Sequence, residues 1–214
     1  MKEVSTSFLK EGSYSNYIEM LNNSNTDYIH FDVMDGKFVK NKNLSIKELE
    51  KYLKMSKKKN DVHLMVKNPK EYIKTLSIYN ISYLTIHKEI ENYKEMIKLI
   101  KSYGIKPGLA INPETDIEDV FEDLKNVSLV LLMSVHPGKS GQEFIEETTN
   151  KISVLKEEIK KKNLNVKISI DGGIKEEVLD KIKDVDIVVS ASYILNDLNN
   201  INKIKTANEL HPLE

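Results

Sequence analysis

The sequence contains no cysteine, and all 32 of its basic residues are lysine. Without cysteine there are no disulfides or thiolate metal sites, so a bound metal must be held by histidine, aspartate or glutamate. Without arginine, a bound phosphate depends on backbone amides, hydroxyls or lysine. The net charge of −1 gives no indication of a nucleic-acid partner. No apolar run reaches the ~18–20 residues of a membrane span, and the N-terminus does not resemble a signal peptide, so we expect a cytoplasmic protein with no membrane partner.

Short runs of apolar and β-branched residues alternate with helical patterns eight times along the 214 residues. Repeated strand–helix units favour a parallel sheet with right-handed crossovers, and eight units close a (β/α)8 barrel, the TIM barrel. We therefore predict a single α/β barrel domain over residues 1–214. The predicted strands are 3–8, 28–33, 61–66, 82–87, 107–111, 128–135, 166–170 and 185–190. The expected helices include one over 116–124 and a seventh that carries Val178, Leu179 and Ile182.

The stretch 28–39 places polar side chains along a predicted strand. His30, Asp32 and Met34 share one face of this strand, and the apolar residues between them share the other. Burying an imidazole and a carboxylate on one face is costly unless something binds them. A metal or a catalytic role would account for this face, and an amphipathic strand with its polar side in solvent is the alternative.

In such a barrel the active site lies at the carboxyl ends of the strands. There the sequence places His30 and Asp32 on the second strand, His63 on the third and Asp171 at the end of the seventh. A single strand histidine is more often a core residue, but the convergence of all four predicts a site for one divalent ion, Zn, Fe, Mn or Co. A substrate between Asp32 and Asp171 would have a carboxylate on each side. This arrangement suits removal of a proton from one face of a carbon and its return to the other.

Glycines suited to phosphate binding follow two of the strands. Gly138 and Gly141 follow the sixth strand, and Gly172 and Gly173 follow the seventh, where backbone N–H groups can approach an anion. Ser192 opens a helical turn after the eighth strand. Each glycine pair alone is also typical of an ordinary turn. Their common placement at the end of the barrel that binds phosphate in this fold favours a phosphate site.

Taken together, these residues resemble the ribulose-phosphate 3-epimerase family over nearly the whole chain. The resemblance implies a (β/α)8 barrel that interconverts D-ribulose 5-phosphate and D-xylulose 5-phosphate, and we expect a homo-oligomer. The segments His-x-Asp-x-Met-Asp-Gly and Asp-x-His-Leu-Met are specific in combination. The matching segments are 5–9, 30–39, 61–66, 112–113, 133–138, 141–144 and 171–173.

Transferred to matching positions, the resemblance gives each candidate residue a role. His30, Asp32, His63 and Asp171 would bind the metal, with Asp32 and Asp171 as the acid–base pair, and Ser7 would contact the substrate. The ketose phosphate, chiefly its phosphate group, would be bound by Gly138, Gly141, Gly172, Gly173 and Ser192, with His63 also counted among the substrate-binding residues. Three methionines match family residues beside the reacting carbon, although core filling is the simpler reading for them: Met34, Met65 and Met133.

The sequence departs from the family pattern around the predicted phosphate site. Lys40 replaces a common proline, Lys139 an aromatic residue, Ser140 a glycine and Ala191 a glycine. Lys139 is therefore a candidate for the cation that arginine would otherwise supply. These departures affect substrate preference more than the reaction. An epimerase for a six-carbon ketose phosphate such as allulose 6-phosphate remains an alternative, and a decarboxylase or a non-catalytic barrel scaffold are more distant ones.

Overall fold

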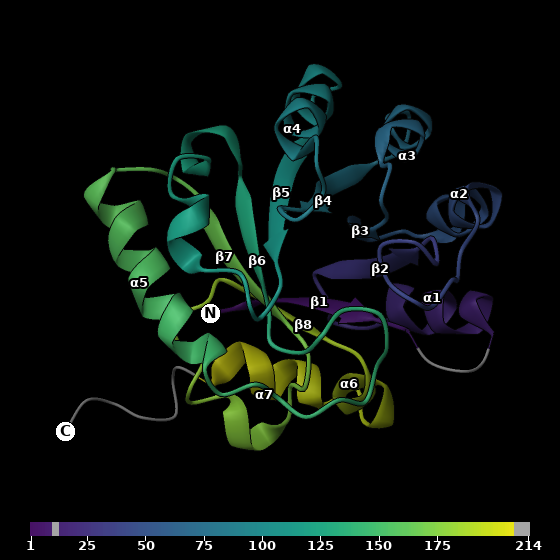
Figure 1. Ribbon diagram of the computed structural model, residues 1–214. Coiled ribbons are helices and arrows are strands. Elements are labelled where there is room, and N and C mark those ends of the chain that lie inside the picture. The colour runs from purple at the N-terminus through teal and green to yellow at the C-terminus, as the bar shows by residue number, and fades with distance from the viewer. Residues whose placement is uncertain (10–12, 208–214) are drawn as a thin grey trace.

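Eight parallel strands close into a barrel in the order of the sequence, as the computed structural model shows for residues 1–9 and 13–207 (Figure 1). Each strand pairs with the next, and β8 closes on β1 through Val4 and Val188. The predicted TIM barrel is confirmed. The strands are β1 (Glu3–Ser7), β2 (Tyr28–Met34), β3 (Lys59–Met65), β4 (Ile81–His87), β5 (Lys106–Ile111), β6 (Leu129–Met133), β7 (Lys167–Asp171) and β8 (Ile187–Ser190).

Helices surround the strands, and they are amphipathic because their apolar residues recur every three or four positions (Figure 1). In α2, for example, Leu49 and Leu53 are buried, and the capping box of Ser45 and Glu48 begins the helix. No helix of the described residues combines the length and apolar character needed to cross a membrane. The helices are α1 (Tyr14–Asn22), α2 (Ile46–Met55), α3 (Lys70–Leu76), α4 (Tyr93–Ser102), α5 (Thr148–Lys161), α6 (Ser192–Asn196) and α7 (Asn200–Thr206).

Two expected helices are corrected by the structure. Residues 116–124 form no continuous α-helix but two short 3₁₀ helices, η1 (Ile117–Val120) and η2 (Leu124–Asn126). The seventh helix is reduced to the 3₁₀ turn η3 (Glu176–Val178). A 3₁₀ helix places side chains three positions apart on one side, so a short connection can bury Ile117 and Val120 together. Apolar spacing of three residues is common to both helix types, which explains the error.

The alternation predicted for the second strand is observed. Ile29, Phe31 and Val33 belong to the apolar layer between the strands and the helices. His30 and Asp32 are buried on the opposite face, inside the barrel. Apolar residues of several strands fill much of the barrel interior around the polar site. This interior cluster consists of Tyr28, Tyr83, Ala110, Leu129, Leu131, Met133, Val135, Ile187 and Val189.

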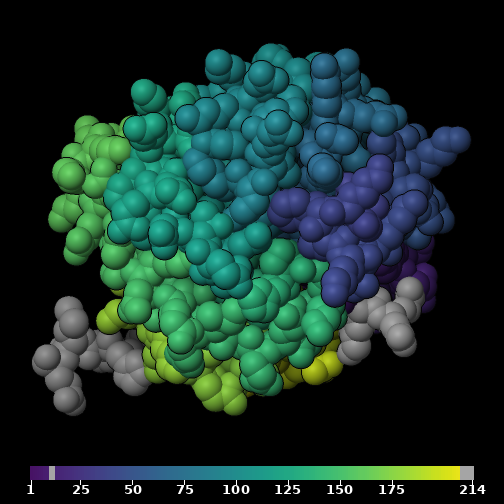
Figure 2. All heavy atoms as spheres, in the orientation of Figure 1, coloured from purple at the N-terminus to yellow at the C-terminus, as the bar shows by residue number. Residues whose placement is uncertain are grey.

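Long loops cover the end of the barrel at which the strands terminate. In the view of Figure 2, atoms of the β6–α5 loop, drawn in green, lie over the middle of this face, with the blue-violet β2–α2 segment beside them. A hydrogen bond from Asn41 Nδ2 to the carbonyl oxygen of Gly138, 2.8 Å long, joins the two loops. The site described next lies beneath them.

Candidate active site

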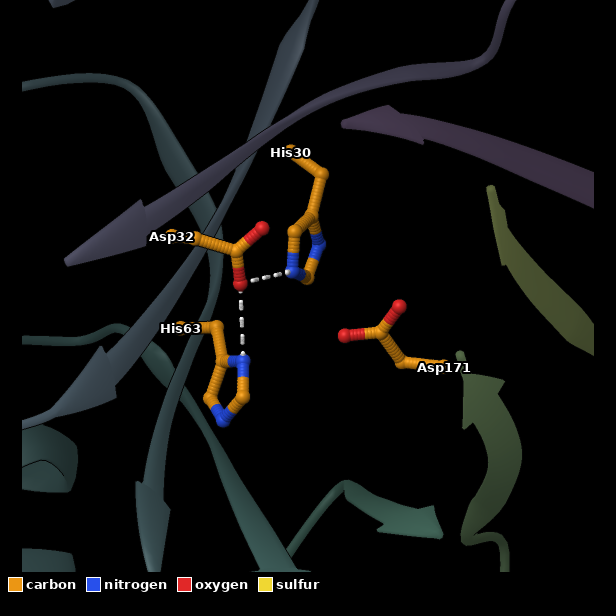
Figure 3. Close-up of side chains that lie close together, drawn as sticks. All are labelled: His30, Asp32, His63 and Asp171. Carbon is orange, nitrogen blue, oxygen red and sulfur yellow. Dashed lines mark hydrogen bonds and ion pairs between the residues drawn. The ribbon is translucent and has the colours of Figure 1, made fainter. Parts of the chain in front are cut away.

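Strand register brings the four predicted polar residues together. Asp32 pairs with His63 across β2 and β3, and His30 lies two residues earlier on the same face of β2. Asp171 ends β7, on the other side of the barrel interior (Figure 3). Each of the four offers one nitrogen or oxygen atom such that these atoms lie within 4.8 Å of one another. The convergence predicted from the sequence is therefore present in the structure.

Both imidazoles are held from behind by hydrogen bonds. His30 Nδ1 lies 2.8 Å from Asp61 Oδ2, which also accepts a hydrogen bond of 2.9 Å from the Ser5 hydroxyl. His63 Nε2 lies 2.8 Å from His87 Nε2. These partners fix both ring orientations and leave one nitrogen of each ring directed into the site.

The two remaining ring nitrogens converge on a single carboxylate oxygen. Asp32 Oδ1 lies 3.3 Å from His30 Nε2 and 3.1 Å from His63 Nδ1, while Asp32 Oδ2 accepts a 2.8 Å hydrogen bond from the Ser7 hydroxyl. His30 Nε2 is buried and has no hydrogen-bond partner of good geometry. An orphaned imidazole nitrogen beside carboxylate oxygens is the donor set that divalent transition metals prefer, so these residues fit a metal ion.

The two aspartates have opposite electrostatic environments. Burial alone would raise the pKa of Asp32, but the charge and close approach of His30, together with the hydrogen bond from His63, bring it far below its usual range. Loss of water raises the pKa of Asp171 to about 6, and the nearby charge of Asp32 adds to the rise. Asp32 is thus strongly held in its ionised form, whereas Asp171 accepts a proton easily. Carboxyl pairs with such divergent pKa values are typical of acid–base sites.

A pocket opens above this cluster, and most of the other predicted site residues line it. Asp32 and Asp171 lie at its floor, and Lys139 and Lys175 are part of its wall. Met34 does not line it; this side chain is buried against Met65, as core filling predicts. The sequence-predicted residues that do line the pocket are Ser7, Met65, Met133, Gly138, Gly141, Gly172, Gly173 and Ser192.

Glycine is required at two of these positions for packing alone. A Cβ atom on Gly172 would lie 2.3 Å from Val135 Cγ2, and one on Gly173 would lie 2.5 Å from the backbone nitrogen of Phe144. Both residues also have positive φ angles, +120° and +65°. The β7 loop therefore lies directly against the β6 loop, which shapes this wall of the pocket.

Three residues that support the site had no role in the sequence interpretation. Asp61 holds His30, whereas His87 and Glu89 lie behind His63. The sequence predicted that the fourth strand ends at His87, but it did not predict that His87 contacts His63. The usable signal was alternation: Asp61 and His63 are two positions apart on β3, so they must share the interior face.

Comparison with known proteins gives the same indication as the geometry. The family model described as "Ribulose-phosphate 3 epimerase family" matches residues 4–195. The chain belongs to this family. It is 40% identical over 174 residues to the ribulose-phosphate 3-epimerase of Helicobacter pylori strain J99, covering 80% of each chain. It is 37% identical over 171 residues to the enzyme of that name from Aquifex aeolicus, covering 78% of this chain and 77% of that one.

Solved structures of other barrels share the fold of this ribulose-phosphate 3-epimerase family member. Phosphoribosyl anthranilate isomerase from Thermococcus kodakaraensis aligns with a TM-score of 0.65 at 16% identity, covering 99% of this chain and 100% of that one. The tryptophan synthase alpha subunit from Campylobacter jejuni gives a TM-score of 0.64 at 16% identity, covering 98% and 95%. At these identities the similarity concerns the barrel alone.

Proposed function

We propose that the chain interconverts D-ribulose 5-phosphate and D-xylulose 5-phosphate by moving a proton at C3. The single observation that carries the proposal is the pair Asp32 and Asp171, which face one pocket from β2 and β7 with oppositely displaced pKa values. Epimerisation needs one base and one acid on opposite faces of the same carbon. The family membership and the names of the relatives support the same reaction.

In one direction, the ionised carboxylate removes the C3 proton, and the electron pair of the C–H bond passes into an enediolate. The protonated carboxyl on the other side then donates its proton to C3, which inverts that centre. The two residues exchange protonation states, so the reverse reaction begins with their roles interchanged. The Ser7 hydroxyl holds Asp32 Oδ2 and keeps that carboxylate oriented toward the pocket.

We further propose that His30, Asp32, His63 and Asp171 hold one divalent ion per subunit, Zn, Fe, Mn or Co. Nitrogen and oxygen donors without thiolate suit these borderline metals. When bound, the ion would stabilise negative charge that develops on substrate oxygens. The neighbouring protein groups keep both imidazoles in place and exclude water from beneath the site.

The phosphate end of the substrate is assigned to the far wall of the pocket. Backbone N–H groups near Gly138, Gly141, Gly172 and Gly173 and the residue Ser192 suit an anion in a chain that has no arginine. Ser7 contacts the substrate, and Met65 and Met133 are apolar lining near the reacting carbon. The homo-oligomeric state and the cellular location expected from the sequence stay predictions.

Replacement of either acid by its amide tests the mechanism. Asp32→Asn and Asp171→Asn should each abolish exchange of the C3 proton of ribulose 5-phosphate in deuterated water, because an amide neither accepts nor supplies the proton. Asp119→Asn, an identical change at an exposed position, is the matched control. Circular dichroism verifies that each variant is folded. Near-normal turnover in either active-site variant would refute the two-base mechanism, and kcat/KM on allulose 6-phosphate distinguishes the six-carbon alternative.

A further inference from the structure

A chain of hydrogen bonds runs outward from the metal-site histidine of β3. His63 Nε2 lies 2.8 Å from His87 Nε2, and His87 Nδ1 lies 3.1 Å from Glu89 Oε2. Both imidazoles are completely buried. The other oxygen of this carboxylate, Glu89 Oε1, accepts hydrogen bonds from the backbone N–H of Asn112 and from the hydroxyl of Thr115, at 2.8 and 2.5 Å.

The direction of these hydrogen bonds follows from the carboxylate at the outer end. An ionised carboxylate only accepts, so His87 Nδ1 must carry the proton that it donates to Glu89. In a neutral ring the other nitrogen, His87 Nε2, is then an acceptor. Its partner, His63 Nε2, must be the donor. With a metal ion bound beside Asp32, His63 Nδ1 would face the cation with its lone pair, and the proton of His63 is then placed on Nε2, as the hydrogen bond to His87 requires.

We propose that His87 and Glu89 are positioning residues that hold His63 in the one tautomer able to ligate a metal through Nδ1. The inference rests on the metal site of the proposed function and extends it to two residues outside the ligand set. In the other tautomer His63 Nδ1 carries a proton and has no lone pair to offer. We call the hydrogen-bonded chain from His63 through His87 to Glu89 the relay. It therefore raises the affinity for the metal, although His87 and Glu89 contact neither the metal nor the substrate.

The loop after β5 supports this hydrogen-bonded chain by holding Glu89 in place. Its motif Asn112–Thr115 fixes Glu89 Oε1 through two donors, so the carboxylate cannot rotate away from His87. The loop is held in turn by Lys151 of α5, whose Nζ donates to the carbonyl oxygens of Pro113 and Thr115, each at 2.6 Å. The motif in this loop is thus linked to His63 through three successive hydrogen bonds, by way of Glu89 and His87.

The substitution Glu89→Gln tests the relay because it exchanges donor and acceptor in each of its hydrogen bonds while it keeps the shape of the side chain. The glutamine oxygen would remain with the two donors at Asn112 and Thr115, so its NH₂ group would face His87 Nδ1. That nitrogen must then accept, His87 Nε2 must donate, and His63 Nε2 must accept. We expect zinc affinity, measured by competition with a chelating dye in the absence of sugar phosphate, to fall about 10- to 100-fold.

The matched control is Glu91→Gln, the same change at an exposed position two residues away, which should bind zinc as the unchanged protein does. A second pair of variants separates tautomer control from packing. His87→Gln retains an oxygen that can accept from His63 Nε2 and should keep more zinc affinity than His87→Leu, which has no acceptor. Thermal unfolding of each variant verifies that it is folded.

Nitrogen-15 NMR of the zinc-loaded protein reads the tautomer directly. We expect a proton on His63 Nε2 and a scalar coupling across the hydrogen bond to His87 Nε2, and this coupling should be lost in Glu89→Gln, where His87 Nε2 carries a proton of its own. Zinc affinity unchanged in Glu89→Gln, equal affinities for His87→Gln and His87→Leu, or a proton found on His63 Nδ1 would each overturn the proposal. None of these measurements uses a sugar phosphate. A result that refutes the relay therefore leaves the proposed function untouched, because the C3 exchange assay tests that function separately.

Discussion

Gly173→Ala should destabilise the protein more than an alanine at any ordinary positive-φ glycine. The new Cβ would lie 2.5 Å from the backbone nitrogen of Phe144, 2.6 Å from its Cα and 3.0 Å from the carbonyl carbon of Glu143. These are backbone atoms of the β6 loop, which cannot rotate aside as a side chain would. Relief of the clash requires the β6 and β7 loops to separate, and these loops form one wall of the pocket.

The expected magnitude has two parts. Alanine in a left-handed conformation costs about 1–2 kcal/mol, and forced overpacking about 1–3 kcal/mol more, so Gly173→Ala should lose about 2–5 kcal/mol. Gly104→Ala isolates the first part, because Gly104 has φ +74° against +65° for Gly173 and nothing within 4 Å of its would-be Cβ. The difference between the two variants measures the clash alone.

Urea denaturation with the free energy of unfolding extrapolated to water provides the measurement, supported by thermal unfolding at about 2–4 °C per kcal/mol. KM for ribulose 5-phosphate provides a second readout, which should rise in Gly173→Ala and stay unchanged in Gly104→Ala. Equal losses of stability in the two variants would show that the loops do not touch as described. A larger loss for Gly173→Ala without a change in KM would separate loop packing from substrate binding.

Two further predictions concern lysines. Lys139→Ala should raise KM for the sugar phosphate with kcat nearly unchanged, because Lys139 is an exposed cation on the pocket wall; equal kinetics would remove it from the phosphate site. Burial lowers the pKa of Lys2 to about 8, against the attraction of Asp184 and Asp186. The unfolded chain therefore binds more protons between about pH 8 and 10.5. Over that range the unchanged protein should gain about 1–2 kcal/mol of stability relative to Lys2→Met, less than the full pKa shift corresponds to because solvent screens a half-buried ammonium group; parallel pH–stability curves from denaturant titrations would contradict this.

The sequence was sufficient for the strands because buried parallel strands leave a simple signal. Short apolar runs such as 128–135 are recognisable wherever both faces are buried, and each predicted strand overlaps an observed one within two residues at either end. The helical connections were less predictable. Ile117 and Val120 satisfy both an α-helical and a 3₁₀ spacing, and the choice depends on how much room the neighbouring elements leave.

For the site, the sequence predicted which residues converge but not what supports them. Alternation along β2 and the ends of β3 and β7 were enough to bring His30, Asp32, His63 and Asp171 together. Hydrogen bonds between strands depend on register, which no local pattern encodes. The contact of His63 with a residue of β4 is of this kind, since it requires knowledge that His63 pairs with Thr85 near the end of that strand.

Strand register also explains why the two aspartates of the site, Asp32 and Asp171, have pKa values displaced in opposite directions. Asp32 lies beside His63 in the β2–β3 register and receives both imidazoles and a serine hydroxyl, so its negative charge is stabilised. Asp171 pairs with Met133 on β6 and Val189 on β8, so its partners in the sheet are apolar, and the largest effect of any charge on it comes from the negative Asp32. Exchange of the two environments would exchange the two acidities. The division of labour between the aspartates is therefore set by strand pairing around the barrel rather than by the side chains themselves.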